Sequence, residues 1–403
     1  MEQIASKVSS ANRMHIGVFG RMNVGKSTFV NRLTGQEVSI VSDREGTTTD
    51  VVKKPMEING IGAVLFLDTA GFDDEATELG KQRVAASRKA AAMSDVCVML
   101  FGKEDDALEK EWVESFLSKG IGVLGVIAKK DTYTKEELSA RLKSLSHLHI
   151  PLVAMDGATG EGVGEVRKQL VKLCGDRKEE RTILGNLVAK GDVVLLVMPQ
   201  DPQAPQARLI QPQVQTIREL LDRGIVFLGA TMDNFSEALA ALEKEPDLIV
   251  TDSQCFAQVN ALKPANSRLT SFSVLFAAYK GDIRYCLEGT KTIDALKEGD
   301  KVLIAEICTH APMKEDIGRE KIPALLRKKA GKNLQIDVCA GSDFPENIKE
   351  YALIIQCGGC MFNRRHILSR TQKAKDAGVP MTNYGLAIAH LNGMLDKVVL
   401  PDA

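Results

Sequence analysis

A glycine-rich segment, GRMNVGKS at residues 20–27, has the residue types and spacing that bind nucleotide phosphates. It follows the apolar run MHIGVFG and opens a helical pattern, which is the strand-to-helix setting that this motif requires. Its glycines let backbone N–H groups surround the phosphates, Lys26 neutralises the β and γ oxygens, and Ser27 ligates Mg²⁺. The residues expected to contact the nucleotide here are Gly20, Asn23, Val24, Gly25, Lys26, Ser27 and Thr28.

Two further segments follow in the order expected of a nucleotide switch. GTTTD at residues 46–50 contains Thr48, whose hydroxyl can reach Mg²⁺ when a γ-phosphate is bound. DTAG at residues 68–71 ends the apolar run AVLFLD, so that Asp68 can be an outer partner of Mg²⁺ and the Gly71 N–H can contact the γ-phosphate. The expected catalytic residues are therefore Lys26, Thr48, Asp68 and Gly71. Together the three segments resemble the Era/TrmE-like branch of translation-factor-type GTPases, over about the first 170 residues.

Base recognition departs from the pattern of that branch. The usual Asn-Lys-x-Asp is replaced by Ala128-Lys-Lys-Asp131 at the end of an apolar run. Asp131 can accept hydrogen bonds from the guanine N1–H and 2-amino group, and Lys129 can lie against the base. Ala128 has no amide to tie the base site to the phosphate loop, and at the later Ser-Ala position only a backbone contact from Gly157 is expected. We predict GTP as the nucleotide, with ATP as the alternative.

The residue that follows DTAG is Phe72, where Ras-like enzymes have a glutamine that orients the attacking water. Intrinsic hydrolysis is therefore expected to be slow. The resemblance implies that Asn23 helps to coordinate K⁺ in the place of an arginine finger, as in potassium-activated relatives. The alternative is that Asn23 only stabilises the loop.

The cysteines that could do chemistry end two apolar runs. Cys308-Thr-His310 ends KVLIAEIC, and Cys357-Gly-Gly-Cys360 ends YALIIQC. The carboxyl ends of adjacent parallel strands open into one crevice, so these segments can converge, and three thiolates suit an Fe–S cluster. The alternatives are a zinc site that includes His310, a redox pair of Cys357 and Cys360, or unliganded thiols. Cys339 also ends an apolar run and could complete the site. The cysteines expected only to pack in the interior are Cys97, Cys174, Cys255 and Cys286.

Length and apolar pattern indicate the domains that position these residues. The chain has 403 residues, of which 44% are hydrophobic and 26% charged, which is typical of two or three globular α/β domains. We expect a P-loop GTPase domain at residues 1–175, a small three-stranded dimerisation domain at 182–265, and a cluster-binding domain at 268–403. The last should contain buried strands in SFSVLFA, KVLIAEIC, LQIDVC and LIIQC.

Charge and hydropathy exclude several classes of partner. The net charge of −1 gives no electrostatic basis for a general nucleic-acid or membrane-surface binder. The N-terminal residues have no leader pattern, and no apolar stretch approaches the roughly 20 residues that span a bilayer. We expect a cytoplasmic protein that binds neither nucleic acid nor membrane.

The chain as a whole resembles the HydF family, GTPases that act as scaffolds in [FeFe]-hydrogenase maturation. The resemblance includes GDVV at residues 191–194, APQARLIQPQVQ at 204–215 and the C-terminal cysteines. The family pattern is Cys-x-His followed by His-Cys-x-x-Cys, and Gln356 replaces the second histidine. That leaves the fourth iron ligand unassigned, and water, a weak carboxylate or His310 could fill the position.

This resemblance implies a homodimer in which Cys308, Cys357 and Cys360 hold a [4Fe–4S] cluster. It also implies that a diiron precursor, assembled with the radical-SAM maturases HydE and HydG, is delivered to the apo-hydrogenase HydA. The alternative hypothesis is a GTP-dependent redox or tRNA-modification enzyme of the Era/TrmE type.

Overall fold

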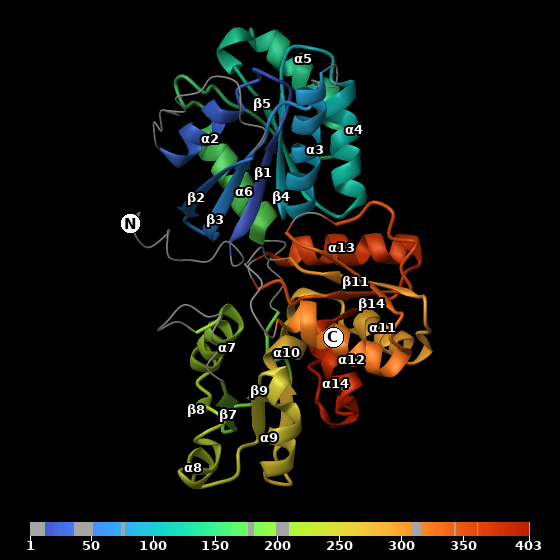
Figure 1. Cartoon of the computed structure of the whole chain (residues 1–403). Coiled ribbons are helices and arrows are strands. Elements are labelled where there is room, and N and C mark those ends of the chain that lie inside the picture. The colour runs from blue at the N-terminus through green and yellow to red at the C-terminus, as the bar shows by residue number, and fades with distance from the viewer. Residues whose placement is uncertain are drawn as a thin grey trace, which may run out of the picture. The chain divides into compact units, whose positions relative to one another are not determined.

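The computed structural model describes residues 13–35, 51–73, 77–175, 181–198, 209–307, 316–341, 344–360 and 362–402. The predicted site residues Thr48, Cys308 and His310, and residues 204–208 of the middle segment, lie outside these ranges. The chain forms two compact units, Met1–Glu179 and Glu180–Ala403, which are described separately below. Both are built of strands that alternate with helices, so the predicted α/β class is confirmed (Figure 1).

The first unit is built on a six-stranded sheet in the order β2-β3-β1-β4-β5-β6. The strands are β1 (Met14–Phe19), β2 (Val52–Ile58), β3 (Gly62–Asp68), β4 (Val96–Phe101), β5 (Gly122–Ile127) and β6 (Leu152–Ala154). All neighbours pair in parallel except β2 and β3. Every residue of β4 and β5 is buried, which is why their sequences are continuous apolar runs.

Helices cover both faces of this sheet (Figure 1). They are α2 (Lys26–Thr34), α3 (Glu78–Met93), α4 (Ala107–Ser118), α5 (Lys135–Leu145) and α6 (Val163–Gly175). α2 and α6 pack on one face, while α3, α4 and α5 pack on the other. The sequence pattern did not predict β2, because its residues are mostly exposed and include Pro55. Both properties are typical of an edge strand, where a missing N–H breaks no ladder.

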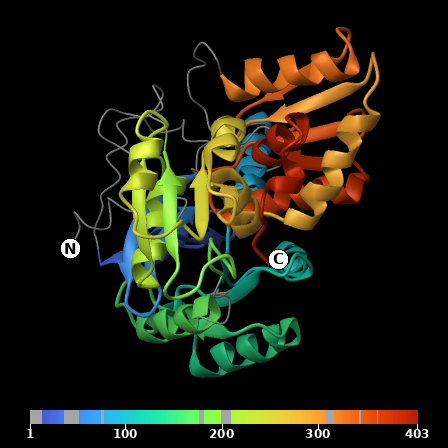
Figure 2. The same ribbon diagram turned by 90° about the horizontal axis from the view of Figure 1, so that it is seen from below.

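The second unit begins with a parallel sheet of four strands in the order β10-β9-β7-β8 (Figure 2). The strands are β7 (Val193–Val197), β8 (Val226–Ala230), β9 (Leu248–Thr251) and β10 (Arg268–Ser271). The helices of this part are α7 (Gln211–Asp222), α8 (Phe235–Ala240), α9 (Phe256–Leu262) and α10 (Phe272–Lys280). The prediction of three strands was wrong, since β10 extends the sheet beyond residue 265.

The run SFSVLFA, predicted as a strand, lies mainly in α10. The side chain of Ser271 accepts a hydrogen bond from the Val274 N–H and thereby caps the helix. Most residues of α10 are buried on more than one side, and its apolar side chains pack into two separate core clusters. A helix buried on several sides loses its apolar periodicity and cannot be told from a buried strand by pattern alone.

The rest of the second unit contains a further parallel sheet in the order β12-β11-β13-β14. Its strands are β11 (Lys301–Ala305), β12 (Gln335–Cys339), β13 (Leu353–Gln356) and β14 (Met381–Asn383). Its helices are α11 (Ile283–Ala295), α12 (Ile322–Ala330), α13 (Arg364–Ala377) and α14 (Tyr384–Leu391). β12, predicted as a buried strand, is a largely exposed edge strand. In the described parts of the chain, no helix has the length and apolar character needed to cross a bilayer.

Candidate functional site

The phosphate loop leaves β1 at Gly20 and enters α2 at Lys26. Three of its residues have left-handed backbone conformations, with φ of 151° at Gly20, 59° at Asn23 and 108° at Gly25. A Cβ atom at Gly20 would lie 2.9 Å from Val24 Cγ1, so this position needs glycine for its space as well as its φ. The loop therefore has the tight turn and helix N-terminus that the sequence predicted.

Lys26 is buried within this loop, with 8% of its surface exposed. Its Nζ donates to the carbonyl oxygens of Gly20 at 3.0 Å and Arg21 at 2.6 Å. Burial lowers the pKa of Lys26, and the carboxylates of Asp68 and Asp73 act in the opposite direction. The ammonium group is thus held inside the loop, where an anionic phosphate would replace the carbonyls as its partner.

Asp68 ends β3 and faces the start of α2. Burial raises the pKa of Asp68, while a hydrogen bond with Ser27 and the charges of Lys54 and Lys26 lower it. Its Oδ1 atom is buried without a hydrogen-bond partner among the described residues. A carboxylate and a hydroxyl in contact, with one oxygen left unsatisfied, fit Mg²⁺ and its coordinated water. Ser27 would ligate that ion, with Asp68 as its outer partner, and the ion would neutralise charge on the phosphates.

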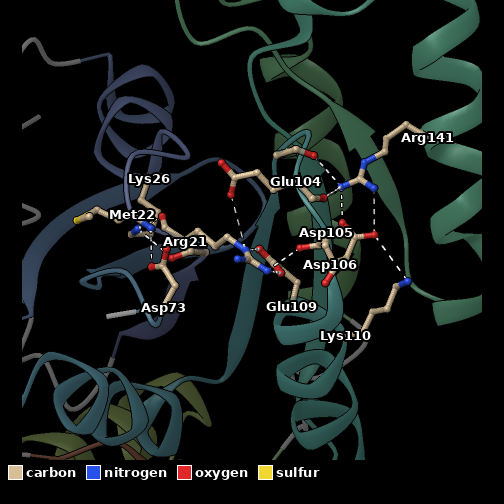
Figure 3. A network of polar contacts seen from close by, with 12 residues as sticks. Arg21, Met22, Lys26, Asp73, Glu104, Asp105, Asp106, Glu109, Lys110 and Arg141 are labelled. Atoms are coloured by element: carbon tan, nitrogen blue, oxygen red, sulfur yellow. Dashed lines mark hydrogen bonds and ion pairs between the residues drawn. The ribbon is translucent and has the colours of Figure 1, made fainter. Parts of the chain in front are cut away.

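Gly71 and the residues after it lie against the phosphate loop. A Cβ atom at Gly71 would be 2.6 Å from the Met22 nitrogen, so only glycine permits this approach. The Met22 N–H donates to Asp73 Oδ1 at 2.9 Å (Figure 3). Phe72 points the other way: it is 3% exposed and stacks on Trp112 with ring centroids 5.1 Å apart. Phe72 therefore lies in the hydrophobic core rather than over the phosphates.

A cavity of about 230 Å³ adjoins the phosphate loop. It is lined by the predicted site residues Val24, Gly25, Thr28, Lys129, Asp131 and Gly157, together with Ala128 and others. Lys129 adopts a left-handed φ of 53°, and a Cβ atom at Gly157 would lie 2.7 Å from Thr28 Cγ2. The structure thus brings the predicted base-recognition residues together around one cavity beside the phosphate loop.

A charged network around Arg21 was not predicted from the sequence. Arg21 Nε donates to Glu109 Oε1 on α4 at 2.9 Å, and its Nη2 donates to the Asp105 carbonyl at 2.6 Å (Figure 3). Asp106, next along the chain, forms an ion pair with Arg141 on α5. The network links the phosphate loop to α4, and it links the start of α4 to α5. The acidic run at residues 104–106 was the only sequence signal of it.

The cysteine turn, residues 357–360, begins immediately after β13. Ala305, the last residue of β11, pairs with both Cys339 and Gln356, so three strands end at one edge. The Ile307 N–H donates to Cys357 Sγ at 3.1 Å. The predicted convergence of the strand ends is therefore confirmed as far as Ile307, while Cys308 and His310 lie beyond the described residues.

The geometry of the cysteine turn fits an iron–sulfur ligand loop. Gly359 has φ of 58°, and a Cβ atom there would lie 2.3 Å from Ile367 Cδ1. Cys357 and Cys360 are both partly exposed, and an amide N–H donated to Cys357 Sγ is typical of cluster-binding thiolates. Gln356 is buried, and its Oε1 has no hydrogen-bond partner among the described residues. Within the described ranges no three potential ligands gather to hold a metal ion, so the site would need residues beyond them.

The remaining cysteines divide as expected. Cys97, Cys174, Cys255 and Cys286 are buried. Cys339 is intermediate in exposure, and burial raises the pKa of its thiol. Cys339 therefore stays a candidate ligand at the same end of the sheet as Cys357.

Matches with known proteins agree with this geometry. GTPase Der from Wolinella succinogenes is 32% identical over 186 residues, which are 43% of this chain and 38% of that protein. The tRNA modification GTPase MnmE from Symbiobacterium thermophilum is 34% identical over 172 residues, 40% of this chain and 35% of that protein. The chain thus spans less than half the length of these curated relatives.

Solved structures give weaker likenesses. Era in complex with MgGDPNP and part of 16S ribosomal RNA has a TM-score of 0.35 and 19% identity, and the match covers 54% of this chain and 91% of that one. The FeoB G-domain from Methanococcus jannaschii has a TM-score of 0.30 and 22% identity, over 41% of this chain and 99% of that one. At these TM-scores neither likeness carries an argument.

The phosphate loop, the carboxylate beside Ser27 and the base cavity define a P-loop GTPase, and residues 15–129 match the family model of the 50S ribosome-binding GTPase. The second unit matches two models of one family. Residues 183–281 match the Hydrogen maturase F dimerization domain, and residues 284–401 match the Hydrogen maturase F tetramerization domain. The chain belongs to the hydrogen maturase F (HydF) family.

Proposed function

We propose that this chain is a GTP-hydrolysing scaffold that binds a [4Fe–4S] cluster and transfers a diiron precursor to apo [FeFe]-hydrogenase. The observation that carries the proposal is the cysteine turn at the end of β13, beside the end of β11 from which the chain continues to Cys308. Membership of the HydF family supports the maturation role. HydE and HydG as donors, HydA as acceptor and a cytoplasmic location are parts of the same proposal.

In the GTPase reaction, Lys26 and the loop amides would bind and orient the phosphates, Ser27 and Thr48 would ligate Mg²⁺, and Asp68 would be an outer partner of the ion. Thr48 and the Gly71 N–H would sense the γ-phosphate, and Lys129, Asp131 and Gly157 would select guanine. In the second unit, Cys308, Cys357 and Cys360 would hold the cluster, which supplies an iron open to an incoming ligand. The boundaries expected from the sequence are 1–175, 182–265 and 268–403. Because β10 belongs to the sheet of the middle domain, we propose 1–175, 182–271 and 272–403 instead.

The decisive experiment is anaerobic reconstitution of the full chain with iron and sulfide, followed by EPR of the reduced protein and metal analysis. A [4Fe–4S] signal with about four irons per chain is expected from three cysteine ligands. One zinc per chain and no signal would favour the structural zinc alternative.

MnmE, named as a tRNA modification GTPase, is similar to 40% of this chain. The same preparation should therefore be tested for tRNA binding. We expect none at physiological salt, because the net charge is −1. Tight binding that weakens with salt would favour the tRNA-modification alternative.

K⁺ should accelerate GTP hydrolysis more than Na⁺, by roughly 10-fold or more, a fraction of what an arginine finger supplies. Phe72 is buried against Trp112 and offers no group to the attacking water, whereas Asn23 is exposed on the loop. Asn23→Gly should remove the K⁺ effect, and glycine is chosen because φ is 59° at this residue. Asn59→Ala, at an exposed turn, is the control. Equal rates in K⁺ and Na⁺ would refute the cation role and leave the GTPase intact.

The middle domain should form a homodimer through the open edge of β8. β8 ends the sheet, and Val226 on it is 64% exposed. Among the described residues no strand pairs with its outer side, so its backbone groups can pair with a second copy. Val226→Lys should weaken self-association roughly 10-fold in sedimentation experiments, because lysine at an edge opposes pairing. Leu262→Lys, at a residue 55% exposed on α9, should leave the dimer unchanged. Equal effects of the two variants would contradict the β8 interface.

A further inference from the structure

Lys280, the last residue of α10, is a buried lysine beside the cysteine turn. Only 2% of its surface is exposed. Its Nζ donates to the Phe362 carbonyl at 2.9 Å and to the Gly359 carbonyl at 3.4 Å. These two carbonyls flank Cys360, so one ammonium group is bonded on both sides of a predicted cluster ligand.

Burial of an ammonium group is unfavourable unless polar partners replace its water. The carbonyls of Gly359 and Phe362 can accept hydrogen bonds from Lys280 only in the present backbone conformation, which includes the left-handed φ of 58° at Gly359. A different conformation of the turn would leave the Lys280 ammonium group buried without these two hydrogen-bond partners. Lys280 therefore stabilises this conformation of the turn.

A second buried cation donates hydrogen bonds to the residues that follow the neighbouring strands. Arg370 on α13 is 3% exposed, and its guanidinium donates to the carbonyls of Glu306 and Gly341. Glu306 follows β11, Gly341 follows β12, and Gly359 follows β13. Lys280 and Arg370 thus donate hydrogen bonds to the segments that follow all three of these strands, at the end of the sheet where Cys339 and Cys357 lie. The buried Glu306 carboxylate at this end of the sheet is already paired with Arg319, so the charges of Lys280 and Arg370 favour a further anionic group there.

We propose that Lys280 is a positioning residue for the cluster, which fixes the cysteine turn and contributes positive charge that favours the reduced cluster. The proposal rests on the proposed function. It also assigns a link between two parts of the protein, because Lys280 lies within the matched dimerization domain, residues 183–281, whereas the cysteine turn lies within the matched tetramerization domain.

The test compares three variants of the full chain with wild type. Lys280→Met keeps the length of the side chain and removes its charge, and Lys280→Arg keeps the charge. Lys263→Met is the matched control, because Lys263 Nζ also donates to two carbonyls, those of Pro264 at 3.2 Å and Ser267 at 2.6 Å, neither of which belongs to the cysteine turn or its flanking residues. The readouts are amide hydrogen exchange of residues 353–365 in the metal-free protein, the rate of iron loss to a chelator, and the midpoint potential of the reconstituted cluster by EPR titration.

Lys280→Met should accelerate exchange in residues 353–365 and lose iron roughly 10-fold faster, the usual size of the effect when a group that orients a metal ligand is removed. Its midpoint potential should shift to a more negative value, because a nearby positive charge favours the reduced cluster. Lys280→Arg should restore most of the potential, and Lys263→Met should match wild type in all three readouts.

Wild-type exchange and potential in Lys280→Met would overturn the proposal. Faster exchange with an unchanged potential would overturn the charge effect and leave only a structural role. If wild type takes up no cluster, the proposed function fails, while the exchange rates still decide whether Lys280 fixes the turn. Should Lys280→Met raise exchange throughout β11 and β13, Lys280→Gln, which retains an N–H donor, takes its place in the comparison.

Discussion

Replacement of Lys26 by alanine should lower GTP hydrolysis by at least ~100-fold, the loss typical when a preorganised charge that stabilises the transition state is removed. Lys26 is buried in the phosphate loop and its Nζ is held by the carbonyls of Gly20 and Arg21. Lys26 is the only lysine in the phosphate loop, residues 20–27. Binding of a fluorescent GTP analogue and release of phosphate would both be measured.

Lys168→Ala is the control for this variant, because Lys168 lies on α6 with 77% of its side chain exposed. It should behave as wild type in both assays. Near-normal hydrolysis by Lys26→Ala would mean that the phosphate loop is not the site of the reaction, and would contradict the GTPase mechanism derived above.

Alanine at Cys357 or at Cys360 should reduce the cluster content of the reconstituted chain to background. Alanine is preferable to serine, whose hydroxyl could still bind iron. Cys286→Ala is the matched control: burial raises the pKa of Cys286 to about 12, so its thiol stays protonated and unavailable to a metal. Iron, sulfide and the EPR signal of the reduced protein would be compared. Full cluster content in either turn variant would refute the cysteine turn as a ligand loop.

Replacement of Cys339 tests whether the proposed cluster has an open position. Cys339 pairs in register with Ala305 at the same strand edge as Gln356, so it is close enough to be an alternative fourth ligand. We expect Cys339→Ala to retain the cluster and added cyanide or imidazole to change the wild-type EPR spectrum. If Cys339→Ala loses the cluster as completely as Cys308→Ala, and added ligands leave the spectrum unchanged, the site is closed.

The strands that the sequence predicted well are those buried on both faces. β4 and β5 are continuous apolar runs because helices cover both sides of them. The errors have physical causes: α10 is apolar on several sides and resembles a strand, and β2 is too polar to resemble one. β10 has only four residues, which gives too little pattern to identify.

The residues of the candidate sites also differ in how well the sequence predicts them. Residues in contiguous motifs, such as Lys26, Asp68 and Asp131, could be named from the sequence because each motif carries its own spacing. Arg21 and Lys280 could not, because their partners are distant along the chain: Glu109 is 88 positions from Arg21, and Phe362 is 82 positions from Lys280. Only the fold shows which distant backbone carbonyls and carboxylates meet a given cation.

The stack of Phe72 on Trp112 has a consequence for observing the protein at work. The chain contains one tryptophan, and its indole lies against the residue that directly follows Gly71, with the Arg88 guanidinium 5.7 Å from the ring. Indole fluorescence from the protein therefore has a single source, which contacts Phe72, the neighbour of the Gly71 proposed to contact the γ-phosphate. The protein carries its own optical reporter of the segment at Gly71 and Phe72, and stopped-flow fluorescence can follow its movement without any attached dye.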